Sequence, residues 1–141
     1  MELHGANGYL PDQFLLEVVE ALVSVCGADR AGARIVPGGT FNGMYDSNPT
    51  ALFGYLAERL NRFGLAYLHI IEPRIKGNTL IAEGQSPVTA EQLPKIYRGK
   101  IIAAGGFQPG TAEEIVEKGE ADLVAFGRHF LANPDLPRRI R

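Results

Sequence analysis

The chain lacks the features that mark a secreted, membrane-bound or nucleic-acid-binding protein. It has one cysteine, Cys26, so no internal disulfide can form, and we expect this residue to be buried within an apolar helical stretch. No apolar run approaches the roughly 20 residues of a membrane span, and no signal-peptide pattern opens the sequence. Fourteen basic and sixteen acidic residues, without a Lys/Arg run, give no footprint for nucleic acid or a membrane surface. We therefore expect a cytoplasmic protein with neither partner.

The composition is that of one ordinary globular domain. The chain has 141 residues, of which 45% are hydrophobic and 21% are charged. It contains no sequence repeat, low-complexity tract or linker, so we expect a single domain over residues 1–141.

Apolar runs and helical patterns alternate along the sequence. Four near-continuous apolar runs, at 31–37, 65–73, 99–107 and 121–128, are typical of strands that are covered on both faces. Helices are expected at 14–26, 47–64, 88–99 and 110–119. The first would bury a face formed by Leu15, Val18, Val19, Leu22 and Cys26.

Capping residues support the later helices. Asn48 and Pro49 are expected to begin the second helix, and Gly64 to end it. The third and fourth helices carry capping-box patterns, Thr89 with Gln92 and Thr111 with Glu114.

This alternation predicts right-handed βαβ units on a parallel sheet. The two longest connections, 38–47 and 74–87, follow predicted strands. Ligands bind at the carboxyl ends of such strands, so we expect a site there.

Two predicted strands end in residues suited to a phosphate. Gly105 and Gly106 precede a helix start, and Gly127 and Arg128 end the next strand. Glycines let backbone N–H groups approach an anion, and arginine adds a permanent charge with a bidentate fork. The pair matches the phosphate site of barrels, formed after strands 7 and 8. The alternative is two ordinary turns and a solvated arginine.

Arg34 lies inside an apolar strand, where a buried arginine is costly without a partner. It is either half of a structural ion pair or a contact for an electron-rich group such as a flavin pyrimidine edge. His69, in the middle of another strand, is expected to be a core histidine with its hydrogen bonds satisfied, and His129 a surface neighbour of Arg128.

A polar trio follows a short strand-like segment at the start of the chain. His4 and Asn7 can direct two N–H donors at one carbonyl oxygen, and Tyr9 offers a weak acid nearby. Each residue alone would more often be structural; together they are a candidate catalytic group.

With these residues in hand, the chain resembles the Old Yellow Enzyme family of FMN-dependent ene reductases. The segment "ELHGANGYLPDQF" is similar to the substrate-site signature of that family. The segments "GARIVP", "NGMYDSNP", "AYLHIIEPRIKGN", "IIAAGGF" and "ADLVAFGRHFLANPDLPRRI" are similar to its later blocks, in the same order. The resemblance implies an α/β fold, the C-terminal portion of a (β/α)8 TIM barrel from the end of strand 4 through strand 8.

The resemblance also implies roles. His4 and Asn7 would bind the carbonyl of an α,β-unsaturated substrate, and Tyr9 would protonate its α-carbon after hydride transfer from FMN N5. NADPH or NADH would reduce the flavin. The implied FMN contacts are Arg34, Gly105, Gly106, Gly127 and Arg128.

The chain departs from the family in length. A barrel of this type has about 250 residues, and the family's long loop is missing where Phe14 meets Leu15, which predicts an internal deletion. Open strand edges are then expected to favour self-association or pairing with an N-terminal half of the barrel. The alternative to an ene reductase is a non-catalytic half-barrel that at most binds FMN or acts as an assembly module.

Overall fold

The computed structural model describes residues 11–37, 39, 46–72, 75–76, 79–80 and 92–140. Its helices are α1 (Pro11–Cys26), α2 (Pro49–Leu60), α3 (Pro109–Glu117), α4 (Arg128–Ala132) and α5 (Leu136–Arg139). Its strands are β1 (Gly32–Ile35), β2 (Tyr67–Ile71), β3 (Ile75–Lys76), β4 (Thr79–Leu80), β5 (Ile101–Ala104) and β6 (Leu123–Ala125). Short 3-10 helices lie at Ala28–Arg30, Asn61–Phe63 and Leu93–Lys95.

Four strands form one parallel sheet in the order β1-β2-β5-β6, as the alternating sequence predicts. Arg34 is paired with His69, and Ile71 with Ala104, so the carboxyl ends of the strands lie along one edge. The strand order follows the chain without reversal, which is the arrangement of a barrel rather than of a doubly wound sheet. The hairpin of β3 and β4 is a separate, antiparallel pair, which the sequence analysis did not predict.

Local capping explains where α2 begins and ends. The Asn48 side chain accepts a 3.2 Å hydrogen bond from the backbone N–H of Ala51, and Asp46 accepts one of 2.7 Å from the N–H of Asn48. Helix α2 ends at Leu60 and is followed by the 3-10 helix Asn61–Phe63, which ends at Gly64, where the backbone is left-handed with φ of 62°. The predicted cap at Asn48 is confirmed, whereas Gly64 ends the 3-10 helix and not α2 itself.

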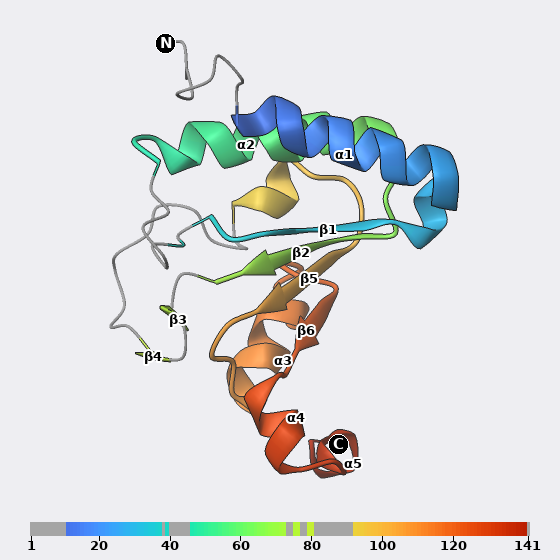
Figure 1. The fold of residues 1–141 in the computed structure, drawn as a ribbon. Coiled ribbons are helices and arrows are strands. Elements are labelled where there is room, and N and C mark those ends of the chain that lie inside the picture. The colour runs from blue at the N-terminus through green and yellow to red at the C-terminus, as the bar shows by residue number, and fades with distance from the viewer. Residues whose placement is uncertain are drawn as a thin grey trace.

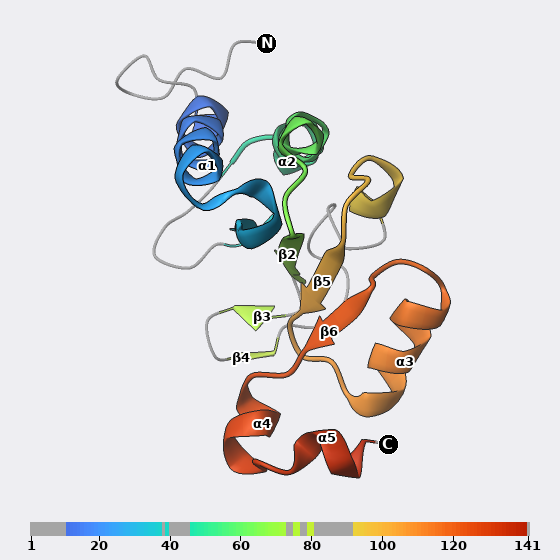
Figure 2. The same cartoon turned by 90° about the vertical axis from the view of Figure 1, so that its right-hand side faces the viewer.

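The core lies between the sheet and its helices. Leu56 and Leu60 of α2 are buried against strand residues such as Leu68 and Ile70, which are fully covered. Figure 1 shows α1 and α2 side by side over β1 and β2, and Figure 2 shows α3 beside β6. Right-handed crossovers between neighbouring strands place the helices on one face of the sheet.

The opposite face of the sheet, called the open face below, is only partly covered among the described residues, which corrects the expectation of strands covered on both sides. Residues of β1 alternate between exposed and buried, with Gly32 and Arg34 exposed. On the same face Tyr67 is 40% exposed and Leu123 is 58% exposed. The four apolar runs are nearly continuous in sequence because both faces of the strands carry apolar residues. Within the described residues, however, helices pack only against one of these faces.

Helix α1 is rotated relative to the predicted face. Leu16 and Val19 are buried, whereas Val18 and Leu22 are 39% and 47% exposed. Cys26 is also exposed, contrary to the expectation that it is buried. The sequence offers apolar residues on two adjacent stripes of this helix, and packing against α2 selects the stripe of Leu16 and Val19.

Two other predicted helices differ from expectation. Within the described part of 88–99, the structure has a single 3-10 turn, Leu93–Lys95, whose central Pro94 lacks an N–H for helical bonding; Thr89 lies outside the described residues. Helix α3 begins at Pro109, so its capping contact joins the Gln108 N–H to the Thr111 hydroxyl at 3.0 Å. Helices α4 and α5 were not predicted.

Across the described ranges, no helix is both long and apolar enough to cross a membrane.

Asp122 provides a test of how the C-terminal strands are joined. Its carboxylate accepts hydrogen bonds from Lys100 Nζ at 2.7 Å and from the Ile101 N–H at 2.9 Å, and these bonds lower its pKa. A lowered pKa stabilises the fold above the unfolded-state value, and this gain is lost as the pH falls through the folded-state pKa. We expect Asp122→Asn to reduce the free energy of unfolding at pH 7 by about 1 kcal/mol. Urea denaturation at several pH values should show the difference shrinking in acid.

Asp135→Asn is the matched control for this experiment. Asp135 pairs with Arg139 at 2.9 Å between exposed side chains of one helical segment, so its loss should cost about 0.3–0.5 kcal/mol. Equal losses for the two variants would contradict a linking role for Asp122.

Candidate functional site

A cavity of about 450 Å³ opens at the carboxyl ends of the strands, on the open face of the sheet. It brings together every residue that the sequence analysis assigned to cofactor binding, from three strands far apart in the chain. The predicted residues on its wall are Arg34, Gly105, Gly106, Gly127 and Arg128; the other lining residues are Ile71, Ala104, Phe107, Gln108, Ala125, Phe126 and His129.

The loop after β5 requires glycine at its first position. Gly105 and Gly106 have φ of 117° and 72°, a region that other L-residues rarely adopt. A Cβ at Gly105 would lie 3.1 Å from both the backbone N and the backbone O of Glu72. Phe107, which is 2% exposed, fixes the far side of the loop in the core. The backbone of the Gly105–Gly106 loop therefore lies close to the end of β2 on one side, and its other side faces the cavity.

The loop after β6 continues directly into α4. The Gly127 carbonyl accepts hydrogen bonds of 3.1 Å from the N–H groups of Phe130 and Leu131, so Gly127 caps the helix. Arg128 is the first residue of α4 rather than the end of the strand, because β6 ends at Ala125. The two predicted phosphate loops thus reach the cavity from neighbouring strands.

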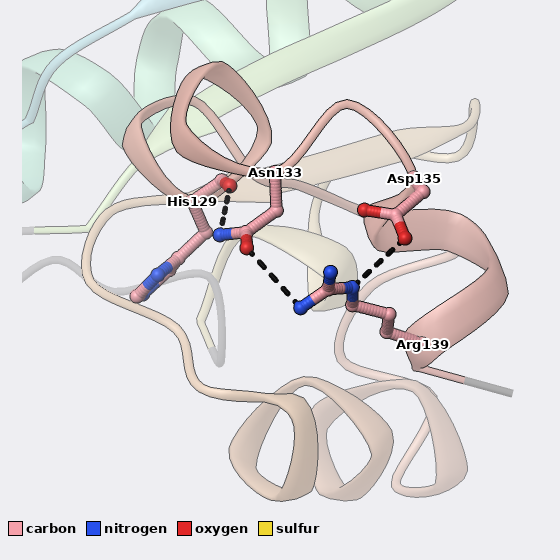
Figure 3. A network of polar contacts seen from close by, with 4 residues as sticks. All are labelled: His129, Asn133, Asp135 and Arg139. Atoms are coloured by element: carbon pink, nitrogen blue, oxygen red, sulfur yellow. Dashed lines mark hydrogen bonds and ion pairs between the residues drawn. The ribbon is translucent and has the colours of Figure 1, made fainter.

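A polar network holds α4 and α5 together next to the cavity. Asn133 Nδ2 and the Asn133 N–H each donate a 3.1 Å hydrogen bond to the carbonyl of His129. Arg139 pairs with Asp135 at 2.9 Å and reaches Asn133 Oδ1 at 3.4 Å (Figure 3). This network fixes the main chain that carries Arg128 and His129.

The cavity is suited to an anion. Among the lining residues that the structure describes, Arg34, Arg128 and His129 can carry positive charge, and none is acidic. Arg34 is exposed on the open face of the sheet, which corrects the expectation that this strand arginine is buried. Its side chain faces the cavity instead of the helix-packed core. Cationic side chains and backbone N–H groups at one cavity favour phosphate or another electron-rich group.

His69 lies beside Arg34 on the neighbouring strand. Its Nε2 is buried without a hydrogen-bond partner among the described residues, which corrects the expectation of a satisfied core histidine. Burial, followed by the positive charge of Arg34, lowers the pKa of His69. The imidazole therefore remains neutral to a lower pH than usual and adds no second charge beside Arg34.

Two polar residues of the cavity, Gln108 and His129, were not among the predicted site residues. Gln108 follows the glycine loop as the N-cap of α3, and its Nε2 lies 3.4 Å from Nε2 of His129. The sequence placed His129 at the surface next to Arg128, and it is exposed as expected. Its position on the cavity wall depends on the two loops meeting, which no local pattern encodes. The predicted catalytic trio, His4, Asn7 and Tyr9, lies outside the described residues.

Comparison with known proteins agrees with this geometry. The model of the NADH:flavin oxidoreductase / NADH oxidase family matches residues 13–141. The 12-oxophytodienoate reductase 2 of Arabidopsis thaliana is 40% identical, over 100% of this chain and 43% of its own length. Morphinone reductase in complex with tetrahydroNAD is 38% identical with a TM-score of 0.79, covering 100% of this chain and 36% of that one. The old yellow enzyme from Trypanosoma cruzi is 33% identical with a TM-score of 0.79, covering 92% and 33%.

These comparisons confirm the resemblance to Old Yellow Enzymes and the fold class, because the described parallel strands superpose on part of a (β/α)8 barrel. The chain spans less than half the length of each of these relatives. The alignment with the Arabidopsis protein runs over 163 positions, more than the 141 residues of the chain. The relative therefore has residues within the matched region that this chain lacks, while the placement of the internal deletion between Phe14 and Leu15 stays a prediction.

Gly105 offers a test of the loop geometry. Gly105→Ala places a methyl group on a backbone with positive φ and against the Glu72 main chain. We expect a loss of about 1–3 kcal/mol in the free energy of unfolding, measured by urea denaturation. Gly110→Ala, in the first turn of α3, is the matched control because its Cβ would meet nothing within 4 Å. If both variants were equally stable, the strained geometry assigned to Gly105 would be wrong.

Proposed function

The chain belongs to the NADH:flavin oxidoreductase / NADH oxidase family, and from that premise we propose that it binds FMN and takes part in the NAD(P)H-dependent reduction of α,β-unsaturated carbonyl compounds. The observation that carries this proposal is the meeting of Arg34 and the two glycine loops at one cavity. A phosphate and an electron-rich ring are bound by a permanent cation and by backbone N–H groups that can approach the ligand closely. This cavity offers both.

The residues of the cavity fit FMN. The glycine loops at 105–106 and 127–128 would hold the phosphate, with the Arg128 guanidinium as its cationic partner. Arg34, on β1, would contact the flavin ring, since it lies on the same face of the sheet as Ile71 and Ala104 at the cavity wall. The cavity volume lies within the range of about 300–1,000 Å³ that is usual for cofactor sites.

The substrate half of the proposal rests on the N-terminal trio. N–H donors from His4 and Asn7 would stabilise negative charge on the carbonyl oxygen, and the Tyr9 hydroxyl would supply a proton to the α-carbon. Bound FMN supplies the hydride chemistry that protein side chains lack. NADPH and NADH are both candidate reductants; the structure of morphinone reductase, a similar protein, is that of a complex with tetrahydroNAD.

A second candidate function is an FMN-binding or assembly module without catalysis. It is favoured by the open face of the sheet, where Tyr67 and Leu123 are exposed. A chain that covers 43% of the Arabidopsis relative supplies part of the flavin cradle. In this case FMN would bind through the phosphate loops, and turnover would be absent or would need a partner at the open strand edges, either a second copy or an N-terminal half of the barrel.

Arg128→Ala tests the phosphate assignment. Removal of a charge-assisted bidentate contact should weaken FMN binding about tenfold to a hundredfold, as measured by quenching of flavin fluorescence. Arg138→Ala removes an equal charge from α5, away from the cavity lining, and should change the Kd less than twofold. Equal Kd values for wild type and Arg128→Ala would remove Arg128 from the site.

Turnover separates the two candidate functions. If the chain is an ene reductase, NADPH or NADH should bleach the flavin-loaded protein, and cyclohexenone should restore its yellow colour. Tyr9→Phe should slow the reoxidation by cyclohexenone at least tenfold and leave FMN binding unchanged, because only proton transfer is lost. A loaded protein that does not reoxidise with the enone would favour the binding module, and an unchanged rate in Tyr9→Phe would exclude Tyr9 as the proton donor.

A further inference from the structure

We propose that His129 is a specificity-determining residue that contacts the phosphate of the bound flavin, so that the cavity selects FMN over riboflavin. This proposal rests on the proposed function, since it assumes that flavin occupies the cavity. It adds a contact beyond those assigned above to the glycine loops and to Arg128.

His129 lies where the two glycine loops approach one another. It follows Arg128 on α4, and its ring Nε2 lies 3.4 Å from the side-chain amide of Gln108, which follows the other loop. Both side chains line the cavity together with Gly106 and Gly127. A histidine at this point faces the same space as the residues predicted to hold the phosphate.

The main chain of His129 is held by hydrogen bonds from Asn133, whereas its ring takes no part in these bonds. Its carbonyl accepts two hydrogen bonds from Asn133, and the Asn133 side chain is in turn held by Arg139. Figure 3 shows the imidazole pointing away from Asn133 and Arg139. The ring is therefore not part of the network that stabilises α4 and α5, and it is available to the cavity.

The contact with Gln108 leaves one ring nitrogen for a ligand. When the Gln108 amide donates to Nε2, the ring proton of neutral histidine lies on Nδ1, which becomes a free N–H donor. Among the described residues that line the cavity, none is an acid that would compete for this donor. A phosphate dianion, with its several acceptor oxygens, matches an N–H donor that lines the same cavity as Arg34 and Arg128.

Paired affinities for FMN and riboflavin test the assignment, because riboflavin is the same ring system without the phosphate. In His129→Ala, the Kd for FMN should rise about fivefold to tenfold, and the Kd for riboflavin should change less than twofold. His129→Gln, which keeps an N–H donor, should recover part of the FMN affinity. Gln108→Ala should give a smaller loss in the same direction, and Arg138→Ala is the charge control.

The outcomes distinguish failure of this inference from failure of the proposed function. If FMN binds wild type but His129→Ala leaves its Kd unchanged, or weakens FMN and riboflavin equally, the phosphate contact is overturned while the proposed function stands. If wild type binds neither flavin, the proposed function fails.

Inorganic phosphate then tests the contact without flavin. NMR of the imidazole Cε1–H of His129, assigned by its loss in His129→Gln, should show a shift that saturates with phosphate and is reduced in Arg128→Ala. Absence of a saturable shift would overturn the inference.

Discussion

The in-register parallel pairing of β1, β2, β5 and β6 is the constraint on which the rest of the structure depends. Parallel strands joined by helical crossovers all end at one edge, so residues that are distant in the sequence meet there without any direct sequence signal. Arg34, Ala104 and Ala125 reach one cavity for this reason. A shift of one residue in any pair would turn the affected side chains from the cavity to the helix-packed face.

Close packing at the strand ends gives the cavity its shape. A side chain at Gly105 would lie tightly against the Glu72 backbone on a main chain with positive φ, and Phe107 holds the same loop in the core. On the other side, Asn133 fixes the carbonyl of His129, and α5 is joined to that point through Arg139. The cationic groups on the cavity wall are therefore supported by fixed main chain, which reduces the entropy lost when a ligand binds.

The same pairing leaves the other face of the sheet open. In a complete barrel, side chains such as Tyr67 and Leu123 would point into a packed interior. Here they remain exposed among the described residues, and β1 and β6 each have a neighbour on one side only. Relatives that are more than twice as long carry further chain beyond the matched region. The cavity with its two glycine loops is formed by residues of this chain alone.

By itself, the sequence determined the order of the four strands of the parallel sheet, the helices α1, α2 and α3, and the candidate phosphate residues, because capping residues, apolar runs and strand-ending glycines are local signals. Asn48 caps α2 as predicted, Gly64 ends the 3-10 helix that follows α2, and the four apolar runs contain the four strands of the parallel sheet. Only the tertiary structure decided which stripe of α1 is buried, leaving Cys26 exposed, and which face of the sheet is open. It also placed His129 beside Gln108. These features depend on contacts between segments far apart in the chain, whose energies are set by packing and register rather than by local preference.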